Sequence, residues 1–124
     1  MIQTNICVVL LHIGANLINT YYDWSKGIDL THVSNTDLQL VNGRVSSFGV
    51  LLLAVMCYCA SIYSIWPIPI QGSDGATIYI VIVLLSFFYS APPFGFKYKW
   101  CAEIVVFLCF GPLLTLFVVY LYTG

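Results

Sequence analysis

Four long apolar segments, each nearly free of charge, constrain the fold of this chain more than any other feature. They cover residues 6–22, 45–66, 76–91 and 102–123. A helix needs about 20 mostly apolar residues to span a bilayer. Only 7% of the 124 residues are charged, whereas a soluble domain carries roughly 25%. We therefore predict an all-α integral membrane bundle, a single multi-pass domain with about four transmembrane helices in contact with the lipid bilayer.

The segments differ in length and in how they end. The second and fourth are long enough to span a membrane, whereas the third is short and the first needs residues 1–5 to reach that length. Pro67 ends the second segment, and residues 71–75 are predicted to form a turn. Pro112, which follows a glycine inside the fourth segment, predicts a kink because proline removes a helix hydrogen bond.

The basic residues are predicted to lie together at one face of the membrane. Lys26 and Arg44 lie in the first loop, and Lys97 and Lys99 lie in the third. With four spans, these two loops share a side. The second loop carries Asp74 and no Lys or Arg. The positive-inside rule makes the shared face cytoplasmic, so the two most polar loops should meet there.

A stripe of polar residues runs along the first apolar segment. His12, Asn16, Asn19 and Asp23 are spaced by four, three and four residues, which places them on one face of a helix. Hydrogen bonding between helices by the asparagines is one interpretation. Polar residues inside a membrane more often face a wet cavity and serve a function. We favour function because the stripe ends in an aspartate and further charged residues follow it.

The oxygen ligands in this region indicate which metal would bind. Asp23, Asp29 and the amides of Asn16 and Asn19 are hard oxygen donors. Mg²⁺ prefers one or two carboxylates, several waters and the phosphate oxygens of a substrate. The pattern therefore suits Mg²⁺ bridging a diphosphate at a membrane face, and it suits zinc poorly.

Neither the cysteines nor the net charge points to another class of site. The five cysteines lie in or beside apolar segments, and their Cys-x-Cys pair lacks the spacing of a zinc site. We interpret them as small apolar residues. The net charge of −1 and the lack of a basic run give no indication of nucleic-acid binding.

The loop over residues 89–99, YSAPPFGFKYK, is a second candidate element. Lys97 could hold a diphosphate as a point charge. Tyr89 and Tyr98 could line the path of a carbocation, whose charge a ring face stabilises. The alternative is an interfacial anchor, since Tyr, Trp and Lys gather at membrane surfaces. The loop taken alone does not decide between these interpretations.

These motifs resemble a known family. The stretch NTYYDWSKGID, with Asn19, Asp23 and Asp29, resembles the first aspartate-rich motif of the UbiA prenyltransferases, closest to the branch that makes menaquinone. The stretch YSAPPFGFKYK followed by FLCFGPL resembles the same branch. The likeness runs from about residue 14 to the last residue.

The resemblance implies transfer of a polyprenyl group from a prenyl diphosphate to an aromatic, naphthoate-type acceptor in the biosynthesis of menaquinone or a related quinone such as ubiquinone, with Mg²⁺ as cofactor. It implies Asn19, Asp23 and Asp29 as metal ligands, Asp23, Asp29 and Lys97 as catalytic residues, and Asn16, Asn19, Lys26, Tyr89 and Tyr98 as substrate-binding residues. The membrane would be an endomembrane or mitochondrial membrane in a eukaryote and the plasma membrane in a bacterium.

The chain departs from the family pattern in extent. The family forms bundles of about nine spans with two aspartate-rich motifs, whereas this sequence carries about four spans and the first motif. We interpret residues 1–124 as a partial UbiA-like domain. Without the second motif, one Mg²⁺ and one or two lysines would leave much of the diphosphate charge unpaired, which is costly in a low-dielectric site. We therefore expect little or no transferase activity from this chain alone. The alternative is a truncated, non-catalytic membrane protein that binds a prenyl lipid or a partner.

Overall fold

The computed structural model describes residues 2–27, 40, 43–66 and 73–123. Within these ranges the chain forms helices and turns and no β-strand, which confirms the all-α prediction. The helices are α1 (Ile2–Ser25), α3 (Ser47–Ile65), α4 (Ser73–Phe88), α5 (Ala102–Leu108) and α6 (Leu114–Thr123), with a 3₁₀ turn η1 (Phe96–Tyr98) and a π-helical turn η2 (Cys109–Leu113).

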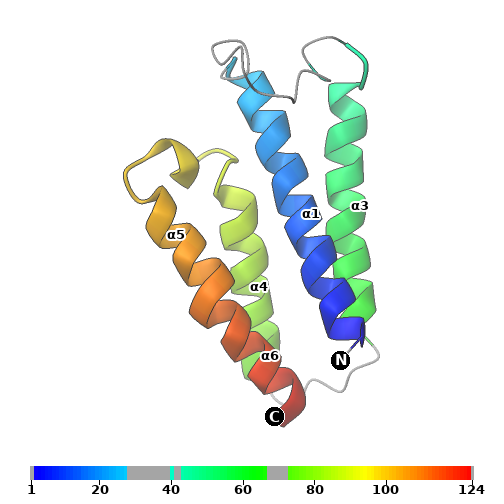
Figure 1. Ribbon diagram of the computed structural model, residues 1–124, viewed down its shortest axis with the longest axis vertical. Coiled ribbons are helices and arrows are strands. Elements are labelled where there is room, and N and C mark those ends of the chain that lie inside the picture. The colour runs from blue at the N-terminus through cyan, green and yellow to red at the C-terminus, as the bar shows by residue number, and fades with distance from the viewer. Residues whose placement is uncertain (1, 28–39, 41–42, 67–72, 124) are drawn as a thin grey trace.

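The helices lie side by side as two pairs, α1 with α3 and α4 with α5–η2–α6 (Figure 1). The two chain termini lie at one end of the bundle, here called the terminal end, and the α4–α5 connection lies at the other, here called the loop end. Gly14 lets α1 approach α3 closely. A Cβ atom there would lie 3.3 Å from the Tyr58 ring and 3.4 Å from the Ala54 carbonyl oxygen.

Three helices of the described residues are long and apolar enough to cross a membrane: Ile2–Ser25, Ser47–Ile65 and the continuous helix Ala102–Thr123. Because α1 begins at Ile2, the residues before the first apolar segment do extend it. The fourth helix, α4, has 16 residues and is about 24 Å long, shorter than the roughly 30 Å of a hydrocarbon core. The prediction that the third segment is short is confirmed.

The outward faces of the bundle are apolar, as lipid contact requires. Large apolar side chains such as Leu52, Met56 and Phe107 are exposed on α3 and α5. Trp66, which follows α3, is 80% exposed, and Trp100, which precedes α5, is 90% exposed. These two residues lie near opposite ends of the bundle, where aromatic side chains gather at the two interfaces of a membrane.

One local prediction is corrected. The turn predicted at residues 71–75 is wrong for its last three residues, because α4 begins at Ser73 and Asp74 lies in its first turn, and residues 71–72 lie outside the described residues. A carboxylate is favourable there because it faces the positive end of the helix dipole. The kink predicted at Pro112 falls in the π-helical turn η2, which contains the proline and separates α5 from α6. Such a turn re-accommodates the backbone where proline removes a hydrogen bond.

The buried core lies toward the terminal end. It consists of Cys7, Leu11, Ile65, Tyr79, Ile82, Cys109, Phe117 and Leu121. Hydrogen bonds join the helices inside it: the Tyr79 hydroxyl lies 2.6 Å from Ser61 Oγ, which in turn donates to the Cys7 carbonyl at 3.2 Å. All five cysteines are free, and three of them are buried, in agreement with their interpretation as small apolar residues.

Candidate functional site

The end of α1 and the loop after α4 meet in a charged cluster at the loop end of the bundle. Asn19 and Asp23 lie one turn apart on α1, and Lys97 and Tyr98 lie in η1. Lys97 Nζ donates to Asn19 Oδ1 at 2.7 Å and forms an ion pair with Asp23 Oδ2. The Tyr98 hydroxyl donates to Asp23 Oδ1 at 2.8 Å. Residues more than seventy positions apart thus share one cluster.

Backbone hydrogen bonds hold the loop in the conformation that presents Lys97. The Lys97 amide donates to the Tyr89 carbonyl oxygen at 2.7 Å, and the Gly95 amide donates to the Ala91 carbonyl oxygen at 3.0 Å. Gly95 has φ = +51°, a left-handed conformation that residues with a Cβ adopt only at a cost. The chain therefore turns back on the end of α4 and directs Lys97 toward α1.

Ser90 is a member of this cluster that sequence reasoning missed. Its hydroxyl donates to Asn19 Oδ1 at 3.0 Å, and the residue is only 1% exposed. Asn19 Oδ1 therefore accepts from both Ser90 and Lys97, which fixes the orientation of the amide. A single serine in a loop has no spacing pattern that would mark it, so only the fold reveals this contact.

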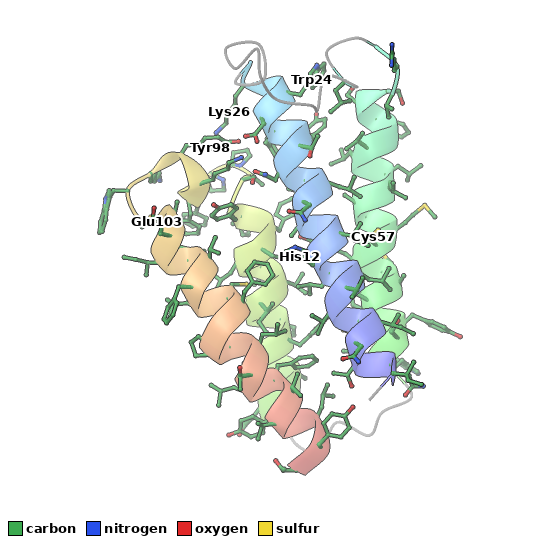
Figure 2. All side chains as sticks on the ribbon, viewed as in Figure 1. His12, Trp24, Lys26, Cys57, Tyr98 and Glu103 are labelled. Atoms are coloured by element: carbon green, nitrogen blue, oxygen red, sulfur yellow. The ribbon has the colours of Figure 1, made fainter. Side chains whose placement is uncertain are left out.

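Lys26 borders the cluster from the other side. Its ammonium lies 3.4 Å from the centroid of the Tyr98 ring, a cation–π contact, and Figure 2 shows the two side chains close together. Lys26 therefore places a second positive charge near Asp23 without contacting the carboxylate. Asp29, the second predicted metal ligand, lies outside the described residues.

A cavity of about 450 Å³ lies below the cluster, between α1 and α4–α5–η2. Its polar end carries Asn19 and Lys97, and its other walls are mostly apolar. Farther along, His12 contacts the Phe110 ring edge-to-face, with ring centroids 5.1 Å apart. The lining residues are His12, Ala15, Asn16, Asn19, Leu85, Ser86, Tyr89, Lys97, Val105, Val106, Cys109 and Phe110.

The polar stripe predicted on α1 therefore lies on one face of the helix, toward the cavity and the charged cluster. His12, Asn16 and Asn19 line the cavity, and Asp23 continues the stripe into the charged cluster. The predicted meeting of the two polar loops is found for the described start of the first loop, since Asp23 pairs with Lys97 and Lys26 lies over the Tyr98 ring. Of the other predicted site residues, Tyr98 binds Asp23 and Tyr89 lines the cavity. The apolar lining from α5 and η2 was not anticipated from the sequence.

Tyr89 carries a neutral phenol into the cavity. Burial raises the pKa of its hydroxyl above the usual value of 10, and the negative charges of Asp23 and Glu103 raise it further. At neutral pH the Tyr89 side chain is therefore uncharged, and it presents a neutral aromatic ring to the cavity.

The described residues do not form a complete metal cage, since no three His, Cys, Asp or Glu side chains gather among them. They do offer the Asp23 carboxylate and the Asn19 amide oxygen, which lie one turn apart on α1 and share the contact with Lys97. This donor set fits Mg²⁺, which takes few protein ligands when the phosphate oxygens of a substrate complete its shell. It does not fit a structural zinc ion, which needs four protein ligands.

Together these features define a class: a multi-pass integral membrane protein with a charged cluster at one end of an intramembrane, largely apolar cavity. Comparison with known sequences then assigns the family. The chain belongs to the UbiA prenyltransferase family, whose sequence profile matches residues 1–124.

Three relatives illustrate the match. UbiA prenyltransferase domain-containing protein 1 is 35% identical in Gallus gallus and 36% identical in Homo sapiens, over 94% and 90% of this chain. The Drosophila melanogaster homolog is 32% identical over 98% of the chain. The chain spans about a third of these relatives, namely 35%, 33% and 34% of their lengths. No solved structure was found to match the chain.

Proposed function

We propose that the chain forms part of an enzyme that transfers a polyprenyl group from a prenyl diphosphate to an aromatic acceptor. The observation that carries this proposal is the cluster of Asn19, Asp23 and Lys97 at the polar end of an apolar cavity. A prenyl diphosphate has the matching form, because it joins a strongly charged head to a long apolar chain. Membership of the UbiA prenyltransferase family supports the same reaction class.

The charged cluster would bind the diphosphate. Asp23 and Asn19 would hold Mg²⁺, which when bound supplies positive charge to the oxygens of the leaving diphosphate, and Asn16, two turns from Asp23 on α1, would contact the substrate in the cavity. Lys97 provides a point charge for a phosphate oxygen. Tyr98 donates to Asp23 at 2.8 Å and orients the carboxylate. Asp29, which follows in the same motif, is proposed as a further ligand by the family resemblance.

The cavity would hold the reacting carbon and exclude water. The bond between the prenyl carbon and the diphosphate oxygen breaks, the diphosphate keeps the electron pair, and an allylic cation remains. Tyr89 presents a neutral ring near the cluster, and a ring face stabilises a cation. Apolar residues such as Leu85 and Val105 exclude water, which would otherwise capture the cation.

The acceptor is proposed to be a naphthoate-type ring, as in menaquinone biosynthesis. This rests on the likeness of the motif around Asn19 and Asp23 to that branch of the family. An electron-rich ring carbon joins the allylic cation, and the ring then loses a proton. The membrane face that carries the cluster also carries Lys26, Arg44, Lys97 and Lys99, so we propose that it faces the cytoplasm.

Because the chain spans about a third of its relatives' length, the test measures binding of the prenyl diphosphate and not transfer of the prenyl group. The chain is reconstituted in lipid nanodiscs, and radiolabelled farnesyl diphosphate is titrated with Mg²⁺ or with EDTA. We expect Mg²⁺-dependent binding that Asp23→Ala weakens by about tenfold or more, a loss of at least about 1.4 kcal/mol. Asp74→Ala, which removes the same charge in the first turn of α4 at the terminal end, serves as the matched control. Unchanged binding by Asp23→Ala would contradict the proposal.

A further inference from the structure

The ammonium of Lys97 lies where a bound cation would lie. It contacts Asn19 Oδ1 at 2.7 Å and Asp23 Oδ2, and these are two of the oxygens that the proposed function assigns to Mg²⁺. The Lys97 side chain is 28% exposed and that of Asp23 is 13% exposed, so the pair is largely shielded from water. In this arrangement the Lys97 ammonium is the ionic partner of the Asp23 carboxylate.

The charges around this point disfavour a free divalent cation. Asp23 contributes −1, and Lys97 and Lys26 contribute +1 each, so the charged groups joined by direct contacts sum to +1, while Glu103, whose charge acts on Tyr89, makes none of these contacts. A dication that approaches meets two ammonium groups, and its best ligands are already occupied. A polyanion such as a diphosphate is instead attracted to this point, because both ammonium groups carry the opposite charge.

Resting on the proposed function, we propose that Lys97 is a specificity-determining residue that rejects free divalent cations and admits the metal only together with a diphosphate. A diphosphate gives the ammonium a new anionic partner. Lys97 then leaves Asn19 and Asp23, and their oxygens become available to the cation that accompanies the diphosphate. Binding of the two ligands is thereby coupled.

The local structure allows this exchange without a rearrangement of the loop. The Lys97 backbone is fixed by its amide hydrogen bond to the Tyr89 carbonyl oxygen at 2.7 Å. Its side chain has a flexible four-carbon stem and a compact charge with three donors. Only the ammonium needs to move, while η1 keeps the residue next to both partners.

Titration with Mn²⁺ alone tests the proposal, with free Mn²⁺ measured by electron paramagnetic resonance on the chain in nanodiscs. We expect weak binding by the wild type and binding by Lys97→Met that is about tenfold tighter or more, since removing one nearby charge is worth at least that factor. Lys97→Arg keeps the charge and should stay weak. Lys99→Met removes the same charge from an exposed position in the same loop and should also stay weak. A folded Lys97→Met chain that binds Mn²⁺ no better than the wild type overturns the proposal.

A second variant keeps the test open if Lys97→Met does not fold. Asp23→Asn removes the ionic partner of Lys97, so the variant should bind metal-free radiolabelled pyrophosphate severalfold more tightly than the wild type. Added Mg²⁺ should then give no further gain. Equal or weaker metal-free binding by a folded Asp23→Asn chain overturns the inference. The proposed function fails separately if the wild type binds no farnesyl diphosphate in the presence of Mg²⁺, whatever the Mn²⁺ titration gives.

Discussion

Removal of the hydroxyl pair Ser61–Tyr79 should destabilise the bundle in a strongly non-additive way. The Tyr79 hydroxyl lies 2.6 Å from Ser61 Oγ, and Ser61 Oγ donates to the Cys7 carbonyl oxygen, so Tyr79 is the donor to Ser61. Ser61 is 0% exposed and Tyr79 is 6% exposed. The bond joins α3 to α4 where water does not reach.

The magnitudes follow from which polar group each substitution leaves behind. Tyr79→Phe removes one bond while Ser61 keeps its bond to Cys7, so we expect a loss of about 0.5–1 kcal/mol. Ser61→Ala removes the oxygen partner of the buried Tyr79 hydroxyl and leaves it only the weakly accepting Cys7 sulfur, so we expect a loss of about 1–3 kcal/mol. In the double variant no phenol hydroxyl remains, and its cost should fall about 1 kcal/mol below the sum of the single costs.

Reversible unfolding in mixed micelles of increasing SDS content, followed by far-ultraviolet circular dichroism, measures all three free energies. Tyr63→Phe is the control, because Tyr63 is 78% exposed on the same helix as Ser61 and should change the stability little. Costs of the two single substitutions that add within about 0.3 kcal/mol would refute the reasoning, since independent sites behave in that way.

Two further predictions concern the loop and the cavity. Gly95→Ala should cost about 1 kcal/mol or more, because φ is +51° there, and it should weaken Mg²⁺-dependent farnesyl diphosphate binding in nanodiscs. Gly111→Ala, where a Cβ meets nothing within 4 Å, should leave that binding unchanged. Because the pKa of Tyr89 is raised on folding, its neutral form is favoured in the native state, and stability should fall as the pH rises above 10. This fall should shrink in Tyr89→Phe when unfolding is measured against pH, and an identical profile would contradict the prediction.

The site was predictable where it depends on one helix or on the order of loops. The spacing of Asn16, Asn19 and Asp23 determines their common face because α1 has a regular period. The count of spans places Lys97 at the same membrane face as Asp23, and the two residues form an ion pair. Both arguments use local periodicity or topology, which a sequence displays directly.

Contacts that depend on how the helices pack were not predictable. Ser90 binds Asn19 and Phe110 contacts His12, and neither residue has a spacing that links it to α1. The Ser61–Tyr79 hydrogen bond likewise requires knowing which faces of α3 and α4 meet. The start of α4 at Ser73 was missed because glycines and small polar residues there also suit a turn.

The π-helical turn η2 has a consequence for comparing related chains. A π turn inserts one extra residue into a helix, which offsets the residues before and after it by about 100° relative to a regular helix. Val105 on one side lines the cavity, and Phe117 on the other side is buried in the core. A homologue with a one-residue alignment gap at this turn could not keep both residues facing inward, so such a gap would indicate an altered binding cavity.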